Sequence, residues 1–486
     1  MSRPIRRRPR WPFPPIRLAS LLAVALVVGC ASDKPLADPI ATLTSTESTP
    51  TQQERAMAAL DQEPPDDAYI QALRRLLYQP GYTVRVREAA LDRLLAIDPD
   101  AALRTLEVQM PRLTALDWRR RLCAIVVERD WKDMTPTLVR AWAAPMPGWV
   151  DRDDQRPERI ALEKLYGKSG VPDVLFTLFV ESNGVTQQNL RARCWELLIA
   201  LGQRDRLVAL LADTEVAPND ATLADLRVTA RDLGVIPVNR EEILWVRKLR
   251  EPARAAYWSQ AREAVAALGP EQRSNLELRD LAVVVALAQV DPALLQATRA
   301  ELEARIESYL ASPAAGSTHR LDFAGWSGAF PQLFSQWRAE LKWTDLAAIV
   351  LAIDALQTPE VRSHLFDYAD RDLKDRTTEY GGIIRLDEQG RFEVVEFRPR
   401  IKGNDERFEA PQDMLDAGYT GLFHFHFHAT SRNNARYAAP AQGDTLYADS
   451  VRNNALCFTF IDGSRLNVDF YRHGGVSVDL GEIQRP

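Results

Sequence analysis

The sequence predicts a chain of two folded parts, an all-α region followed by a smaller α+β domain. The first observation is a helical period, with apolar residues recurring every three or four positions over about residues 56–374. The second is a change at about Thr377 to short alternating apolar runs separated by turn residues. A third observation sets residues 1–29 apart from the fold, because their composition is that of an export signal.

The N-terminal segment begins with six arginines and no acidic residue, followed by an apolar run from Leu18 to Val28. Eleven helical residues span about 16 Å, roughly half of a hydrocarbon core, so we expect a cleaved signal over 1–29 and not a spanning helix. The run ends in Val27-Val28-Gly29-Cys30, which resembles the lipobox of bacterial lipoproteins. The alternative is an ordinary signal that happens to end at a cysteine.

This resemblance implies that Cys30 carries the lipid and anchors the chain to a membrane, since two or three acyl chains bind stably. Ala31 follows Cys30. By similarity to the enterobacterial sorting rule, this residue favours the outer membrane. We therefore expect a protein of the cell envelope that faces the periplasm or the exterior.

The composition is that of a globular protein, with 486 residues, 46% hydrophobic and 26% charged. Removing the six arginines of 1–29 leaves 55 basic and 67 acidic residues, a net charge of −12. Such an acidic chain argues against nucleic acid as a partner. Cys123, Cys194 and Cys457 fall within apolar patterns and are expected to be buried thiols, with a Cys123–Cys194 disulfide left as an alternative.

Residues 30–55 are rich in Ser, Thr, Pro and Ala and predict a flexible linker. Helical periodicity follows over 56–374, as in the segment from Val84 to Ala90. That segment resembles the second helix of a HEAT-type repeat, and the segment from Asn189 to Leu198 does so more loosely. The resemblance implies an α-solenoid that binds a protein or peptide partner. A globular all-α domain is the alternative.

From 377 to 486 the pattern predicts an α+β domain with a helix from Asp444 to about Arg452. The expected strands are Gly381 to Arg385, Phe392 to Phe397, Gly421 to His428, Leu456 to Ile461, Leu466 to Tyr471 and Val476 to Leu480.

Three of the six histidines lie within one predicted strand, Phe423-His424-Phe425-His426-Phe427-His428. Since side chains alternate along a strand, the phenylalanines share one face and the histidines share the other. Imidazoles two residues apart can bind one ion, so we expect a metal site there. The alternative is a polar strand face without a ligand.

The order of Glu379, His-x-His and Pro440-Ala441-Gln442-Gly443-Asp444 resembles the JAMM (JAB/MPN) metallopeptidase motif. This resemblance, which covers about Thr377 to Leu480, implies a JAMM-like domain that binds zinc. It implies His426, His428 and Asp444 as ligands, with His424 as an alternative ligand, and Glu379 as the general base.

The motif also departs from the family pattern. Ala441 stands where the family has a serine that helps to hold the oxyanion, and Asp444 lies sixteen positions after His428, farther than usual. The sequence thus supports a membrane-anchored zinc hydrolase of amide or isopeptide bonds. The alternatives are a helical scaffold lipoprotein with a degenerate metal-binding domain, and a metal-binding lipoprotein without hydrolysis.

Overall fold

The computed structural model describes residues 36–144, 152–321, 331–401, 403 and 408–486. The predicted signal over 1–29 and Cys30 lie outside the described residues. The chain divides into two compact units, one that ends at Ala102 and one from Leu103 to Pro486. Among the described residues, no helix is both long enough and apolar enough to cross a bilayer.

The unit that ends at Ala102 is helical, and its first helices begin inside the segment predicted to be a flexible linker. Its helices are α1 (Pro39–Thr44), α2 (Pro50–Leu60), α3 (Asp67–Leu76) and α4 (Val84–Ile97), and α5 (Pro99–Gln109) crosses the boundary of the unit.

Local signals explain why helices replace the predicted linker. The Asp38 side chain accepts from the N–H of Ala41, and Thr49 forms a capping box with Gln52. Each of these caps precedes a proline at the first helical position, where proline is favoured. Leu43 is fully buried, which gives α1 a packed side.

The second unit begins with a long series of helices. They are α6 (Leu116–Glu128), α7 (Thr135–Trp142), α8 (Pro157–Tyr166), α9 (Val171–Glu181), α10 (Gln188–Ala200), α11 (Arg204–Ala212), α12 (Ala221–Leu233), α13 (Arg240–Leu249), α14 (Ala255–Ala267), α15 (Pro270–Arg273), α16 (Leu278–Val290), α17 (Arg299–Leu310), α18 (Phe334–Trp337), α19 (Trp343–Gln357) and α20 (Pro359–Asp372). Helices close in sequence pack against one another, including α6 with α8, α9 with α10 and α14 with α16. Cys123 and Cys194 are free, buried thiols, so the alternative of a disulfide between them is not found.

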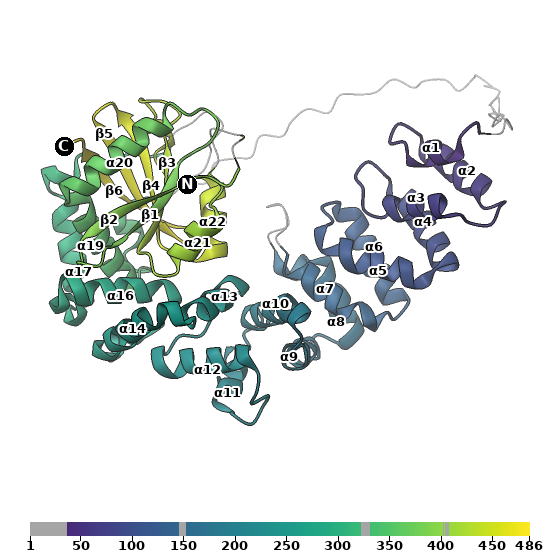
Figure 1. The fold of residues 1–486 in the computed structure, drawn as a ribbon, viewed down its shortest axis with the longest axis horizontal. Helices are drawn as coiled ribbons and strands as arrows, with labels where there is room; N and C mark the ends of the chain where they lie inside the picture. The colour runs from purple at the N-terminus through teal and green to yellow at the C-terminus, as the bar shows by residue number, and fades with distance from the viewer. Residues whose placement is uncertain (1–35, 145–151, 322–330, 402, 404–407) are drawn as a thin grey trace, which may run out of the picture. The chain divides into compact units, whose positions relative to one another are not determined.

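The C-terminal part is a six-stranded mixed sheet with the order β2-β1-β3-β4-β5-β6 (Figure 1). The strands are β1 (Gly381–Leu386), β2 (Phe392–Phe397), β3 (Phe423–His428), β4 (Ala455–Asp462), β5 (Arg465–Arg472) and β6 (Val476–Gln484), with helices α21 (Gln412–Gly418) and α22 (Gln442–Val451). β3 and β4 run parallel, and every other pair is antiparallel. The predicted helical region followed by an α+β domain is confirmed at this level, and α21 was not predicted.

The two faces of β3 have different neighbours. Tyr368 of α20 makes edge-on ring contacts with Phe425 and Phe427, and its hydroxyl donates to the carbonyl oxygens of Gly381 and Phe397. Figure 1 shows α20 lying across the sheet. On the opposite face, Ala448 of α22 packs against Ala455, Cys457 and Tyr471. The histidine face is therefore covered by a helix and not exposed to solvent.

Buried charges join the helices to the end of the sheet. Asp345 of α19 lies 2.8 Å from Arg279 of α16 and 2.9 Å from Arg472 of β5. Arg452, in the left-handed conformation at the end of α22, lies 2.7 Å from Glu242 of α13. These pairs fix the orientation of α22 and β5 relative to the last helices, within the unit that begins at Leu103.

Candidate metal centre

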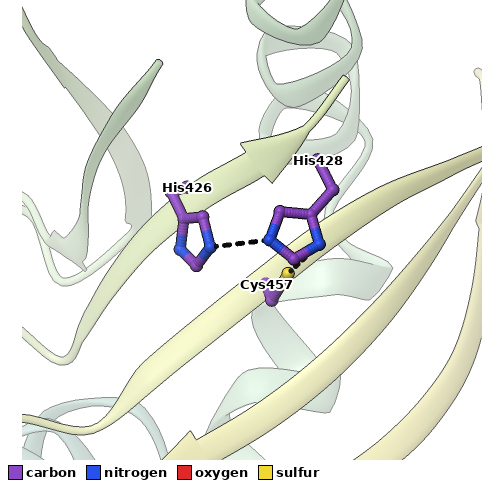
Figure 2. Close-up of side chains that lie close together, drawn as sticks. All are labelled: His426, His428 and Cys457. Atoms are coloured by element: carbon purple, nitrogen blue, oxygen red, sulfur yellow. Dashed lines mark hydrogen bonds between the residues drawn. The ribbon is translucent and has the colours of Figure 1, made fainter. Parts of the chain in front are cut away.

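The centre of the site is the end of β3, which lies between β1 and β4 in the middle of the sheet. The side chains of His426 and His428 point to the same face because they lie two residues apart. Their Nε2 atoms are 3.3 Å apart (Figure 2). The parallel register places Cys457 of β4 opposite His426, so the thiol lies beside the two rings (Figure 2).

Asp444 completes a triangle with the two imidazoles. It is the third residue of α22, and its Oδ2 accepts a hydrogen bond of 2.6 Å from the N–H of Ala441 at the helix N-cap. The same Oδ2 lies 3.3 Å from His426 Nε2 and 3.5 Å from His428 Nε2. The structure thus brings together the three residues that the sequence predicts as ligands.

The size of this triangle fits a tetrahedral metal ion. Zinc binds imidazole and carboxylate at about 2.0–2.2 Å, so two such ligands at the tetrahedral angle lie about 3.3 Å apart. The three distances observed between Nε2, Nε2 and Oδ2 agree with that value. Three ligand atoms on one side of such an ion leave the fourth position open.

The remaining ring nitrogens have partners of their own. His428 Nδ1 lies 3.1 Å from the carbonyl oxygen of Tyr437, which can only accept. In the neutral ring the proton therefore belongs on Nδ1, and the lone pair on Nε2 faces the triangle. His426 Nδ1 lies 3.4 Å from the Tyr471 hydroxyl, which can donate or accept.

Cys457, which its apolar sequence context predicts only as a buried thiol, is a further candidate ligand. Its Sγ lies 3.5 Å from His428 Nδ1, and one ligand atom from each of His426, His428 and Cys457 lies within 4.8 Å of the others. This buried cluster could hold a metal ion. The only sequence signal for it is a cysteine in the strand after the Asp444 helix, and the parallel register needed to interpret that signal comes from the fold.

The acidic and imidazole groups of the site strongly shift one another's pKa values. Burial alone would lower the pKa of His426 and of His428, but Asp444 and Cys457 raise both pKa values well above the ordinary value. Burial would raise the pKa of Asp444 and of Cys457, whereas the two histidines lower them, that of Cys457 to about 7. The site therefore concentrates negative charge around two imidazoles, an environment suited to a cation.

Glu379 lies on the same face at the entry to β1. The N–H of Phe427 donates to the carbonyl oxygen of Tyr380 at 3.1 Å, which continues the β1–β3 register and places Glu379 opposite His428. Opposite residues of an antiparallel pair share a face. Burial raises the pKa of Glu379 above its ordinary value, although His428 and His426 partly oppose this shift.

His424 is also buried on this face but is oriented differently. Its Nδ1 lies 2.9 Å from the hydroxyl of Tyr447, and its Nε2 has no hydrogen-bond partner among the described residues. Burial lowers its pKa to about 4. The His426, His428 and Cys457 cluster contains none of His424, Asp444 and Glu379, but Asp444 contacts both histidines at 3.3 Å and 3.5 Å. Of the predicted site residues, the structure thus places Asp444 against His426 and His428 and Glu379 on the same face, whereas His424 contacts Tyr447.

No protein-family model, curated protein or solved structure matches this chain.

Proposed function

We propose that the C-terminal domain is a zinc-dependent hydrolase of amide or isopeptide bonds with a JAMM-like arrangement of residues. The observation that carries the proposal is the triangle of His426, His428 and Asp444, whose edges of 3.3–3.5 Å match three ligands of one tetrahedral ion. Glu379 lies opposite His428, where this class of enzyme requires a base. The element order also supports the resemblance, with Glu before the first strand, His-x-His ending a later strand and Asp at a helix start.

Each residue has a defined task in this proposal. His426, His428 and Asp444 hold the ion, and Tyr437 fixes the tautomer of His428 through its carbonyl oxygen. When bound, zinc would lower the pKa of a water molecule and polarise the carbonyl of a substrate. Glu379 accepts a proton from the attacking water and donates it to the leaving amine. Its raised pKa suits both steps, since a catalytic base works best when its pKa is near the working pH.

The rest of the chain gives this activity a location and a partner. In the proposal, lipid on Cys30 anchors the chain in the cell envelope, with the outer membrane favoured. The helices before the sheet then recruit a protein or peptide. A substrate outside the cytoplasm is expected to be an envelope peptide or the tail of a partner protein.

The test begins with metal content and then removes the base. We expect the purified chain to bind about one zinc ion, and Asp444→Asn to weaken zinc binding by at least about tenfold. Glu379→Gln should retain the zinc and lose hydrolysis of a peptide library by on the order of a hundredfold or more. The matched control is Glu388→Gln, which changes an exposed carboxylate in the turn between β1 and β2 and should leave both measurements unchanged.

A second function is favoured by one observation, the alanine at position 441. Its methyl group supplies no donor for an oxyanion, and its N–H already bonds to Asp444. The chain would then be a metal-holding scaffold whose helices bind the partner. Zinc binding with no hydrolysis in either the parent chain or Glu379→Gln would favour this function, and absence of zinc would reject the hydrolase.

A further inference from the structure

A cavity of about 300 Å³ lies among α9, α10, α12 and α13, and its lining includes no residue of the candidate metal centre. Three arginines line it, namely Arg191 of α10 together with Arg240 and Arg247 of α13. Thr222 and Asn189 add polar groups, and the described residues that line the cavity include no Asp or Glu. A concave space of this size with a few convergent polar groups is typical of a small-ligand site.

Arg191 is buried and held by contacts that use two of its three guanidinium nitrogens. It is 1% exposed, its Nε donates to the carbonyl oxygen of Phe179 at 2.8 Å, and its guanidinium stacks 4.7 Å from the centre of the Phe179 ring. Its Nη1 pairs with Asp220. The remaining nitrogen, Nη2, is buried and has no hydrogen-bond partner among the described residues. An acceptor group of a ligand in the cavity would satisfy this buried cationic donor.

The charges around the cavity favour an anion. Asp220 neutralises Arg191, and Glu241 pairs with Arg240. Arg247 has no ion-pair partner within 4 Å among the described residues, and its side chain is exposed at the cavity. Asp225 acts on Arg247 at longer range, but its direct ion-pair partner is Arg250. The cavity wall therefore has an excess positive charge and planar donors, which match the geometry of a carboxylate or phosphate.

We propose that this cavity, the arginine pocket, binds a small organic anion through Arg191, Arg240 and Arg247. The anionic group, a carboxylate or a phosphate, accepts from Arg191 Nη2 and from the two arginines of α13. The apolar part of the ligand contacts Phe179 and Ile243, which line the same cavity. This site is independent of the metal centre, because none of its residues belongs to the sheet domain.

The experiment is calorimetric titration of the purified full chain with three probes at constant ionic strength. These are inorganic phosphate, acetate, and a dipeptide offered with a free or an amidated C-terminus. We expect binding of phosphate or of a carboxylate with a Kd of about 1 mM or tighter. Tighter binding of the free dipeptide than of its amide would assign a peptide carboxylate, and preference for phosphate would assign a phosphate ester.

Variants test whether the arginine pocket is the site. Arg247→Gln should weaken binding about tenfold while preserving the fold, because the side chain is exposed and charged hydrogen bonds are strong. Arg191→Lys should weaken it further, and its melting temperature shows whether the fold survives. The matched control is Arg231→Gln, an exposed arginine of α12 paired with Asp232 outside the pocket. The proposal fails if none of the anions binds more tightly than chloride, or if Arg247→Gln and Arg231→Gln weaken binding equally.

Discussion

Replacing Asp345 by asparagine removes the carboxylate that lies between two buried arginines. Asp345 is 0% exposed, and Arg279 and Arg472 lie 2.8 Å and 2.9 Å from its Oδ1. Its Oδ2 accepts from the N–H of Lys342 and from Arg472, at 2.8 Å and 3.0 Å. Asparagine keeps the shape of the side chain but places an amide, without charge, between two guanidinium groups.

The cost follows from the burial of all three groups. Removing one partner of a buried ion pair destabilises a protein by about 3–5 kcal/mol, because the opposite charge stays buried without compensation. Here that charge is on Arg472, since Arg279 keeps Glu277 at 2.8 Å and Asp280 at 3.7 Å. Total stability is usually about 5–15 kcal/mol, so Asp345→Asn should remove a large share of it. The control is Asp354→Asn on the same helix, whose partner Arg305 is exposed, and there we expect less than about 1 kcal/mol.

Urea unfolding followed by tryptophan fluorescence and circular dichroism measures both variants. Burial would raise the pKa of Asp345, but Arg279 and Arg472 outweigh it and lower the pKa below its ordinary value. The stability that this carboxylate contributes is therefore present above about pH 4 and is lost as the pH falls through the folded pKa. The difference between the parent and Asp345→Asn should shrink in acid. A loss at pH 7 no larger than that of Asp354→Asn would refute this reasoning.

Two other changes have outcomes that the structure specifies. Asp469 and Asp479 face each other on β5 and β6; burial raises both pKa values, that of Asp479 to about 6. A carboxyl group with a raised pKa lowers the stability of the protein as the pH rises from about 4 through the folded pKa. Asp469→Asn should therefore flatten the pH dependence of the melting temperature and raise the free energy of unfolding by roughly 1–3 kcal/mol at pH 8. An unchanged slope of melting temperature against pH would contradict this explanation. Gly418→Ala should cost about 1–3 kcal/mol in a urea titration, because its Cβ would lie 2.1 Å from Nε2 of His424. Gly443→Ala, which meets no atom within 4 Å, serves as its control, and equal effects of the two substitutions would contradict the steric explanation.

The strands of the C-terminal domain could be predicted closely because their signals are local. Alternation and turn residues place β2 at Phe392–Phe397, as observed. The predicted end of the last strand at Leu480 is too early, since β6 runs to Gln484. Gly481, at φ +83°, resembles a stop in the sequence, but the pairing with β5 continues past it with a shift of register. A Cβ at this glycine would lie 2.0 Å from the carbonyl oxygen of Ala315, a contact that comes only from the tertiary structure.

The candidate site likewise combines residues that the sequence predicts with one that only the tertiary structure reveals. Strand alternation, a local feature, predicts that His424, His426 and His428 share one face. The resemblance to the JAMM motif then selects His426, His428 and Asp444 from the sequence. Cys457 could not be selected from the sequence, because its position beside His426 depends on the parallel pairing of β3 with β4. In the N-terminal unit a local signal was present but the prediction was wrong. Thr49 before Pro50 is a helix-capping signal, but the polar composition of the segment led to the prediction of a flexible linker.

The parallel connection from β3 through α22 to β4 has a consequence for how this domain can change during evolution. His426, His428, Asp444 and Cys457 all lie within this single strand–helix–strand segment, whereas Glu379 precedes β1. In the proposed hydrolase, the residues that would hold the ion and the residue that would move the proton are therefore encoded in separate pieces of chain. A descendant that lost only Glu379 would keep the proposed ligands and the core, so the two proposed traits could be inherited, lost or transplanted one at a time.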